Sequence, residues 1–477
     1  MSLPYDSQSK DSILDYALLL VNRSLIEFVG DLGIESDAPN KGGFGQVLEK
    51  YYFHKELDSL SQPDFPEAGL ELKSSPIKKL KRKGELRAKE RLVLNIINYQ
   101  ELINQEFVSS SFYTKNASLL LIFYFYDEEL KVLDYKINLV GIWDFPEEDI
   151  KVIEHDWKLI QRKVLDGEAH MLSEGDTFYL GACTKGASAK SVRVQPNSNI
   201  PAKQRAFSLK TGYVNHILAK ISGIEDGSFG KVVKVPDFKE DDLNIEEVIL
   251  KKIRPYYGKT PKDIANNLNV IYNSNAKQRF AQLSTALIKS ILGVSSDKKI
   301  EEFSKANISL KSIRLNTNNL PKENISFSAF EYLKLVDEDE WELSNFNQQL
   351  EKRFLFIFYK EDSTKQLVLE KALFWNMPYI DRQEAKVVWK NTIELLKEGK
   401  IVKEITPTNI FKTYFPKQTE NRVAHVRPHA KDKNDTYPLP VQDQLTSKGS
   451  YMKHSFWLNN TYIRDGVYYI NGQSNEH

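Results

Sequence analysis

The stretch Asp64-Phe-Pro-Glu-Ala-Gly-Leu-Glu71-Leu-Lys73 is the part of this sequence that says most about fold and chemistry. Its alternation of apolar and polar residues predicts a short strand, with leucines on one face and Glu71 and Lys73 on the other. The prolines near Asp64 keep it out of a helix, so it lies on an extended segment or turn that leads into the strand. The sequence thus predicts two carboxylates and a lysine close together at the start of a strand.

Metal-dependent hydrolysis of a phosphodiester needs this arrangement. Two anionic oxygen donors bind a hard cation such as Mg²⁺, with Mn²⁺ as a substitute. The cation stabilises charge on the scissile phosphate, while the lysine orients an attacking water or helps to deprotonate it. The Glu-Leu-Lys triplet alone is weak evidence. In a chain with 65 acidic and 66 basic residues, an acidic residue is followed two positions later by a basic one about nine times by chance. Most exposed pairs of this kind are surface ion pairs that contribute little.

The composition is that of a globular protein with more than one domain, since 477 residues exceed one ordinary core. The net charge of +1 means that a DNA-binding surface must come from local clustering of basic residues. The longest apolar run, residues 119–126, is far too short to span a membrane. The N-terminus has no apolar signal core, so we expect a cytoplasmic protein with no membrane partner. The single cysteine, Cys183, excludes an internal disulfide, and a buried inert thiol is expected.

The first half contains further elements that would surround the stretch. A glycine-rich turn, residues 40–46, opens a helix and leaves Glu49 beside the apolar stripe of that helix. The turn lacks the Walker order, so it favours a close backbone approach over a nucleotide site. Lys115 lies just before a buried strand and can therefore face the same site. Apolar periodicity predicts helices over residues 11–30, 47–53 and 151–166, and buried strands over residues 92–98 and 119–126.

Basic residues cluster in three segments of the first half. Eight of the fourteen residues from 78 to 91 are lysine or arginine, which fits either contacts to DNA phosphates or a solvated loop. Residues 185–190 and Arg193 form a smaller basic loop. Residues 203–220 follow as a basic strand-to-helix segment.

Beyond residues 222–243, where glycine, proline and charge indicate a linker, the chain begins again. The segment Asn307-Ile-Ser-Leu-Lys-Ser312 lines up with Gly69-Leu-Glu-Leu-Lys-Ser74, and Phe456-Trp-Leu458 lines up with Phe207-Ser-Leu209. These echoes predict an internal duplication with a period of roughly 230 residues. The predicted division is a first domain over residues 1–225, a linker over 226–243 and a second domain over 244–477.

The second copy lacks the chemistry of the first. When Lys311 is aligned with Lys73, Ser309 stands at the place of Glu71. In the same alignment, Glu302 falls at the place of Asp64. The position equivalent to Glu49 falls at or next to Lys289. One carboxylate cannot hold a cation as the first set could, and a lysine there would repel it. We therefore expect the second half to be non-catalytic.

In this order the segments resemble the MutH-like branch of the restriction-endonuclease fold, in particular the type II restriction endonucleases that cut GATC. The motifs that carry the resemblance are the helix ending in Val-Leu-Glu49, the spacing of Asp64, Glu71 and Lys73, the Asp156-Trp157 helix, and the segments that begin at Lys89, Lys185 and Arg205. The resemblance implies an α/β fold of two tandem domains, each with a mixed central sheet flanked by helices.

The resemblance also implies catalytic roles for the matching residues. Asp64 and Glu71 would bind Mg²⁺, and Lys73 would orient the attacking water or stabilise the transition state. Glu49 would be an auxiliary carboxylate that binds the metal directly or through water. Lys115 would be an accessory lysine of the active site.

DNA contacts follow from the resemblance in the same way. Lys185 matches a lysine that reads the recognition site in the major groove, and Ser208 stands where the family has a tyrosine. The arginine that precedes this lysine in the family is missing at Cys183 or Thr184. The second copy keeps it in Arg427-Pro-His429, so that half is expected to retain DNA binding. The residues expected to contact DNA are Lys41, Lys81, Arg82, Lys83, Lys185, Lys190, Arg193, Ser208, Lys210, Arg427 and His429.

These observations predict a Mg²⁺-dependent type II restriction endonuclease that cuts double-stranded DNA at GATC. The first half would carry the single active site, so cutting both strands requires a dimer on DNA or sequential nicking. A mismatch-repair nicking enzyme is the first alternative, although such an enzyme needs no second copy. A GATC-binding protein without catalysis is the second, and its DNA binding would not depend on Glu71.

Overall fold

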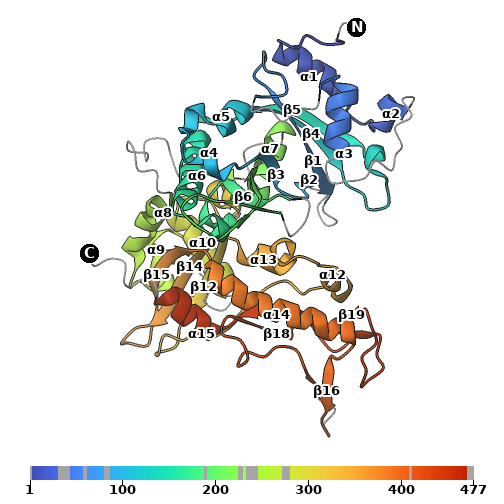
Figure 1. Ribbon diagram of the computed structural model, residues 1–477. Helices are drawn as coiled ribbons and strands as arrows, with labels where there is room; N and C mark the ends of the chain where they lie inside the picture. Colours follow the sequence, from blue (N-terminus) through green and yellow to red (C-terminus); the bar gives the residue numbers. More distant parts are fainter. Residues whose placement is uncertain are drawn as a thin grey trace. The chain divides into compact units, whose positions relative to one another are not determined.

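The chain forms two compact units in the computed structural model (Figure 1). The first unit contains Met1–Asn244 and Asp297–Asn307, and the second contains Ile245–Ser296 and Ile308–His477. The division predicted at residues 226–243 stays a prediction, because most of that segment lies outside the described residues. The structure describes residues 3–30, 43–56, 62–79, 86–186, 191–223, 229–232, 245–270, 280–407 and 411–469.

A mixed four-stranded sheet forms the centre of the first unit, in the order β2-β1-β4-β5. Strand β1 (Glu71–Lys79) runs parallel to β4 (Ser118–Phe125), and β2 (Leu86–Ala88) and β5 (Ile137–Asp144) add antiparallel edges. Residues 118–123 of β4 are all buried, as expected for a central strand that is covered on both faces. Helices near this sheet are α1 (Lys10–Leu18), α2 (Ile26–Val29), α3 (Gly43–Val47), the π-helical turn η2 (Leu48–Tyr52) and α5 (Ser111–Asn116).

A second, three-stranded sheet of the first unit has the order β3-β9-β6. Asp156 fixes its edge, because this fully buried carboxylate accepts backbone hydrogen bonds from three consecutive residues, 178–180, where β6 begins. The elements are β3 (Leu92–Ile96), α4 (Tyr99–Leu102), α6 (Glu147–Leu165), β6 (Leu180–Thr184), β7 (Val192–Arg193), β8 (Ala202–Lys203), β9 (Arg205–Leu209), α7 (Thr211–Ile221) and β10 (Phe229–Gly230).

A segment from the second half of the sequence completes the first unit. It consists of β11 (Lys299–Ile300), which pairs with β10, and the short helix α11 (Glu301–Ala306), which packs against α7. Gly212 permits this approach, because a Cβ there would lie 2.0 Å from the carbonyl oxygen of Ser304. Lys305 of α11 bonds both carboxylate oxygens of Asp149 on α6 at 2.9 Å, and both side chains are buried.

The second unit repeats this architecture. Its central sheet has the order β12-β14-β15, with β12 parallel to β14, and its second sheet has the order β13-β21-β18. The elements are α8 (Ile245–Ile253), α9 (Pro261–Asn267), α10 (Phe280–Ile291), β12 (Ser309–Arg314), β13 (Ile325–Ser326), α12 (Tyr332–Val336), α13 (Asn345–Leu350), β14 (Phe354–Glu361), β15 (Leu367–Trp375), α14 (Tyr379–Glu398), β16 (Val402–Ile405), β17 (Phe411–Thr413), β18 (Ala424–Pro428), β19 (Thr436–Pro438), β20 (Ser450–Met452), β21 (His454–Leu458) and α15 (Asn460–Ile463).

Strand registers confirm the duplication. Lys73 pairs with Leu121 of the parallel neighbour, and Lys311 pairs with Phe356 at the same step of its own sheet. The α/β class with two tandem mixed-sheet domains is therefore confirmed, as is the buried strand predicted over residues 119–126. The strand predicted over residues 92–98 forms as β3, but it is only partly buried, because Leu92 and Leu94 are buried whereas Ile96 is exposed.

The continuous helix predicted over residues 11–30 is wrong. It divides into α1 and α2, and the chain between them turns at Asn22, whose φ is 66°. The backbone N–H of Asn22 donates to the carbonyl of Ile137, and Ile137 donates to the carbonyl of Arg23. Pairing with the start of β5 therefore outweighs the helical periodicity of this apolar segment.

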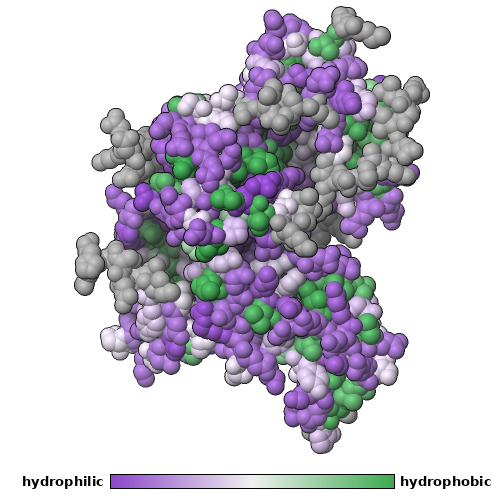
Figure 2. All heavy atoms as spheres, viewed as in Figure 1, coloured by the Kyte–Doolittle hydropathy of each residue, from purple (hydrophilic) through white to green (hydrophobic). Residues whose placement is uncertain are grey.

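Hydrophilic side chains cover most of the face shown in Figure 2, with hydrophobic ones scattered in small groups. Within the described ranges, no helix is long and apolar enough to cross a membrane.

Candidate active site

A tight turn brings Asp64 back to the start of β1. Phe65 and Leu70 exchange two backbone hydrogen bonds of 2.9 and 3.2 Å, which closes the turn. Gly69 has a φ of 61°, a left-handed conformation that favours glycine. In the second copy Asn307 takes the same place with a φ of 57°, so the turn geometry is kept where the chemistry is not.

The two predicted carboxylates lie next to each other. The backbone N–H of Asp64 donates to Oε2 of Glu71 over 3.0 Å, and that of Leu72 donates to Oδ2 of Asp64 over 2.9 Å. Glu71 is buried, with 1% of its surface exposed, while Asp64 is half-buried. Reciprocal bonds to the backbone therefore hold both carboxylates at the end of the turn.

Two lysines converge on Glu71. Lys73, two residues further along β1, bonds Oε1 of Glu71 through Nζ, so the predicted shared face is confirmed. Lys115 lies in the last turn of α5, and its Nζ is 3.7 Å from the same oxygen. The parallel pairing of β1 with β4 causes this convergence, because α5 ends directly before β4 begins.

Glu49 comes from the π-helical turn η2, and such turns are frequent at functional sites. Burial raises its pKa to about 7, and the Asp64 carboxylate adds to this rise. Burial also raises the pKa of Glu71 to about 7, although Lys73 opposes that rise. The charges that act on Glu49 include Lys115, so all five predicted catalytic residues lie in one electrostatic cluster.

The chemistry of this cluster fits a hard cation. The cluster contains three carboxylates and two lysines. Burial and mutual repulsion disfavour the charged forms of Glu49 and Glu71, and a bound divalent cation would stabilise those charged forms. Asp64 and Glu71 are the residues that would hold the cation, with Glu49 nearby. The side chains are not arranged as a finished site, because no three His, Cys, Asp or Glu among the described residues are grouped closely enough to bind a metal ion. Oε1 of Glu71 is instead bonded by Lys73.

Packing contacts locate the equivalent of Glu49 in the second unit. A Cβ on Gly45 of α3 would lie 3.5 Å from Oγ of Ser74, and Ser284 of α10 bonds Ser312 over 2.7 Å. Ser312 aligns with Ser74, so its partner Ser284 aligns with Gly45. Glu49 is the fourth residue after Gly45, and the fourth residue after Ser284 is Ile288. The predicted place next to Lys289 is therefore taken by a buried apolar side chain.

The remaining positions of the second unit are also altered. Ser309 stands at the place of Glu71, because both open the strand that runs parallel to the central one. Glu302 lies in the first unit, where its carboxylate accepts the backbone N–H of Val232 over 2.8 Å. Helix α13 begins at a serine cap as α5 does, which places Gln349 where α5 has Lys115.

One charged residue of this altered site was not predicted from the sequence. Lys352 lies in the turn between α13 and β14, and its Nζ donates to Oε1 of Gln349 over 2.8 Å. The signal that could have found it is the serine cap shared by the two helices, Ser110 and Ser344, which fixes their alignment.

Known proteins match both units. The family of the DNA mismatch repair enzyme MutH matches residues 53–156 and again residues 292–388. The type II restriction enzyme Sau3AI of Staphylococcus aureus is 35% identical over 96% of this chain and 98% of its own length. This chain belongs to the MutH-like type II restriction enzymes. The MutH proteins of Vibrio campbellii and Shewanella woodyi are 23% and 26% identical; they match 45% and 47% of this chain and 95% and 97% of their own lengths. The membership makes the chain an endonuclease of the restriction or nicking kind.

Two of the residues predicted to contact DNA in the first unit of this restriction enzyme are exposed. They are Lys185, directly after β6, and Arg193, in β7. The backbone around them is held by bonds from Lys185 N to Gln204 O (2.8 Å) and from Gln204 N to Ser191 O (3.0 Å). The predicted contacts that lie outside the described residues are Lys41, Lys81, Arg82, Lys83 and Lys190.

Ser208 and Lys210, which were also predicted to contact DNA, are buried. Oγ of Ser208 is 3.5 Å from the carbonyl of Gly181, and Nζ of Lys210 bonds the carbonyl of Thr177. Lys210 also acts on the buried carboxylate of Asp156 and lowers its pKa, against the larger effect of burial. Both side chains therefore hold β6 and β9 together and do not present a surface to a duplex.

In the second unit, Arg427 and His429 are exposed at the end of β18. The guanidinium of Arg427 lies 5.3 Å from the ring centre of Trp457, and the ring of His429 lies 5.7 Å from the same ring. Arg427 pairs with Ser455 as Cys183 pairs with Ala206, so the arginine missing from the first unit stands here at the equivalent step. The registers also place His429 where the first unit has Lys185.

Among the described residues, His425, His429 and His454 do not form a metal cluster. His425 bonds Asn459, and His454 contacts Tyr332 over 3.0 Å and the carbonyl of Met452 over 2.7 Å. Both rings are buried, so these hydrogen bonds are contacts of the core.

Burial makes His454 a source of acid sensitivity, because it lowers the pKa of the ring from 6.5 to about 4. Since the folded-state pKa lies below the unfolded value, the unfolded chain binds more protons between these pH values. Stability should therefore fall as the pH drops through this window, by about 2 kcal/mol between pH 6.5 and 5 from this residue. Urea unfolding of the wild type and of His454→Gln at both pH values measures the difference. Equal pH dependence of the two proteins would contradict the assignment.

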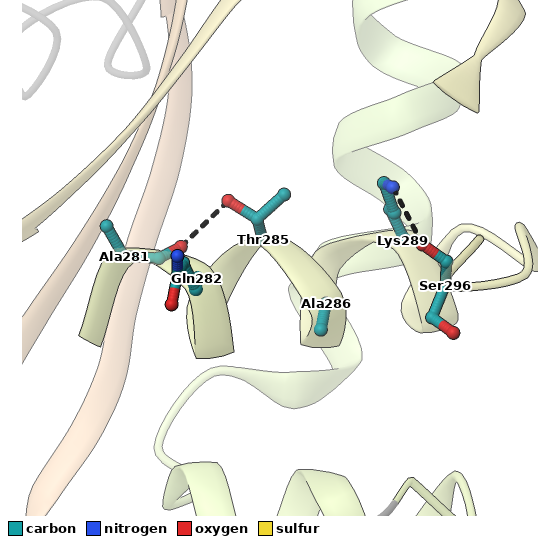
Figure 3. Close-up of a pocket in the computed structure, with 6 residues that line it drawn as sticks. All are labelled: Ala281, Gln282, Thr285, Ala286, Lys289 and Ser296. Carbon is teal, nitrogen blue, oxygen red and sulfur yellow. Dashed lines mark hydrogen bonds between the residues drawn. The ribbon is translucent and has the colours of Figure 1, made fainter. Parts of the chain in front are cut away.

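A cavity of about 320 Å³ lies along α10 in the second unit (Figure 3). Among the described residues, Lys289 is the only charged side chain that lines it, and its Nζ donates to the carbonyl of Ser296 over 3.0 Å. None of the residues predicted to act in catalysis or DNA binding is among those that line it.

Proposed function

We propose that this enzyme acts in the cytoplasm as a type II restriction endonuclease that hydrolyses double-stranded DNA at 5′-GATC sites and requires Mg²⁺, with Mn²⁺ as a substitute. The first unit would carry the single active site, and the second would be a non-catalytic DNA-binding domain. The observation that supports this proposal is the convergence of Glu49, Asp64, Glu71, Lys73 and Lys115 in the first unit only. The mismatch-repair nicking enzyme is less well supported, since the relatives of that kind match about half of this chain.

In the proposed reaction Asp64 and Glu71 would hold the cation, and Glu49 would be an auxiliary carboxylate that binds it directly or through water. The bound cation would stabilise negative charge on the phosphate and lower the pKa of the attacking water. Lys73 would leave Oε1 of Glu71 and turn its ammonium to the water or to a phosphate oxygen. Lys115 would add positive charge on the same side of the carboxylates.

One active site per chain sets the order of strand cleavage. Cutting both strands in one encounter requires two chains on the DNA, whereas a single chain must nick the strands in turn. The first case produces linear plasmid without a nicked intermediate, and the second accumulates nicked circles first. Gel filtration with and without a GATC duplex reports whether a dimer forms.

Plasmid digestion tests the proposal. Unmethylated, adenine-methylated and cytosine-methylated plasmids are incubated with the enzyme in Mg²⁺ or in chelator, without any other protein. Fragments that end at GATC, formed only with Mg²⁺, are the expected result. Nicked circles as the final product would favour the mismatch-repair alternative, and GATC binding without cleavage would favour the non-catalytic one.

Loss of Lys185 should weaken specific binding. If its ammonium contacts a base edge in the major groove, Lys185→Ala should cost about 1–3 kcal/mol for a GATC duplex. Binding is measured in chelator on a GATC duplex and on a scrambled duplex of equal length. An equal loss on both would mean that Lys185 contacts only the phosphate backbone.

A further inference from the structure

The altered site of the second unit differs from the active site mainly in its charge. In the first unit three carboxylates outnumber two lysines, so a cation is needed before a phosphate can approach. At the equivalent places of the second unit the carboxylates have become Ile288 and Ser309, and the third, Glu302, bonds the backbone of Val232 in the first unit. The lysine of the strand remains as Lys311, and Lys352 has been added.

Lys311 is unusual for a half-buried lysine. Among the described residues it has neither a hydrogen-bond acceptor nor a carboxylate partner. Burial lowers its pKa, and the neighbouring Lys352 lowers it further. The positive charge of each lysine thus disfavours the charge of the other, and an anion bound by both would reverse this effect.

The surrounding side chains fit a phosphate group. Lys352 is held by Gln349 over 2.8 Å, so its position is fixed from α13. Ser309 has a hydroxyl at the place of the Glu71 carboxylate, and a hydroxyl can donate to a phosphate oxygen where a carboxylate would repel it. All four side chains are half-buried, so the site remains open to solvent.

We propose that Lys311 and Lys352, with Ser309, form a metal-independent site for a DNA phosphodiester in the second unit. The inference rests on the proposed function, because it takes DNA as the ligand. The duplication would thus have converted a site that cuts a phosphate through a cation into one that holds a phosphate directly. Lysine contacts of this kind carry no sequence information, so the site would bind GATC and other duplexes equally.

Binding of a 20-base-pair duplex to the full chain in chelator tests the proposal. Lys311→Gln/Lys352→Gln should bind GATC and scrambled duplexes about tenfold more weakly, and the slope of log affinity against log salt should fall by about one. The charge-matched control Lys390→Gln/Lys397→Gln, on exposed positions of α14, should bind as the wild type does. Unchanged affinity of the Lys311/Lys352 variant, or an equal loss in the control, would overturn the proposal.

A second variant tests phosphate binding at this site even if the lysine substitutions disturb folding. Ser309→Glu places a carboxylate beside Lys311, as in the first unit, and should also weaken binding about tenfold without creating a second active site. If this variant binds as the wild type does, no phosphate occupies the site. Plasmid cleavage by the wild type is followed in parallel. Absence of cleavage with weaker binding by the variants would refute the proposed nuclease function and leave this site standing.

Discussion

Glu71→Gln should abolish DNA cleavage, by at least about a thousandfold, while DNA binding in chelator changes little. Glu71 is the residue on which the cluster converges, since it contacts the backbone of Asp64 and the side chain of Lys73. Glutamine keeps the shape and removes the charge, so the cation would lose one of its two main ligands. Asp64→Ala and Lys73→Ala should give the same result. Rates are measured on supercoiled plasmid with Mg²⁺.

An exposed carboxylate of the second unit supplies a matched control for this prediction. Glu394→Gln on α14 makes the same change of charge outside every predicted site and should leave the cleavage rate within about threefold of the wild type. A large loss of cleavage in Glu394→Gln, or a Glu71→Gln enzyme that still cuts within tenfold of the wild type, would contradict a single active site in the first unit.

Lys305→Met should destabilise the enzyme by about 3–5 kcal/mol. Lys305 bonds both oxygens of Asp149 at 2.9 Å and Glu301 at 2.8 Å, and its side chain is only 3% exposed. Tyr213 adds a hydrogen bond to the same carboxylate over 2.7 Å. Burial already raises the pKa of Asp149, and Lys305 is the main group that opposes this rise. Without Lys305 the carboxylate would be buried without its cation. Urea unfolding measures the loss.

The second unit again provides the control. Asp381 occupies the same place in α14 and bonds Tyr462 over 2.7 Å, but its cation is Arg422, whose side chain is 55% exposed. Arg422→Met should therefore cost no more than about 1 kcal/mol. Asp149→Asn combined with Lys305→Met should recover part of the stability lost in Lys305→Met alone. A loss below 1 kcal/mol in Lys305→Met, or strict additivity in the double variant, would contradict the buried pair.

The central motif could be predicted from sequence because its spacing is local. Glu71 and Lys73 are two residues apart on one strand, and prolines confine Asp64 to a turn, so short-range geometry places all three. The duplication was also predictable, since Lys311 repeats the position of Lys73 in an unchanged strand register.

Contacts between distant segments could not be predicted. Lys305 lies 156 residues from Asp149, and its sequence neighbours give no sign that α11 belongs to the first unit. The burial of Lys210 has the same cause, because it depends on the carbonyl of Thr177 and on Asp156, which belong to other elements. A basic residue in a basic segment is expected at the surface unless such partners are known.

Anomalous scattering from Mn²⁺ in crystals of the enzyme with a GATC duplex tests the central claim most directly. We expect one Mn²⁺ ion per chain, bound by Asp64 and Glu71 against a DNA phosphate, and no ion beside Ser309 and Lys311. Crystals in which no ion binds between Asp64 and Glu71, or in which an ion occupies the second unit instead, would contradict it.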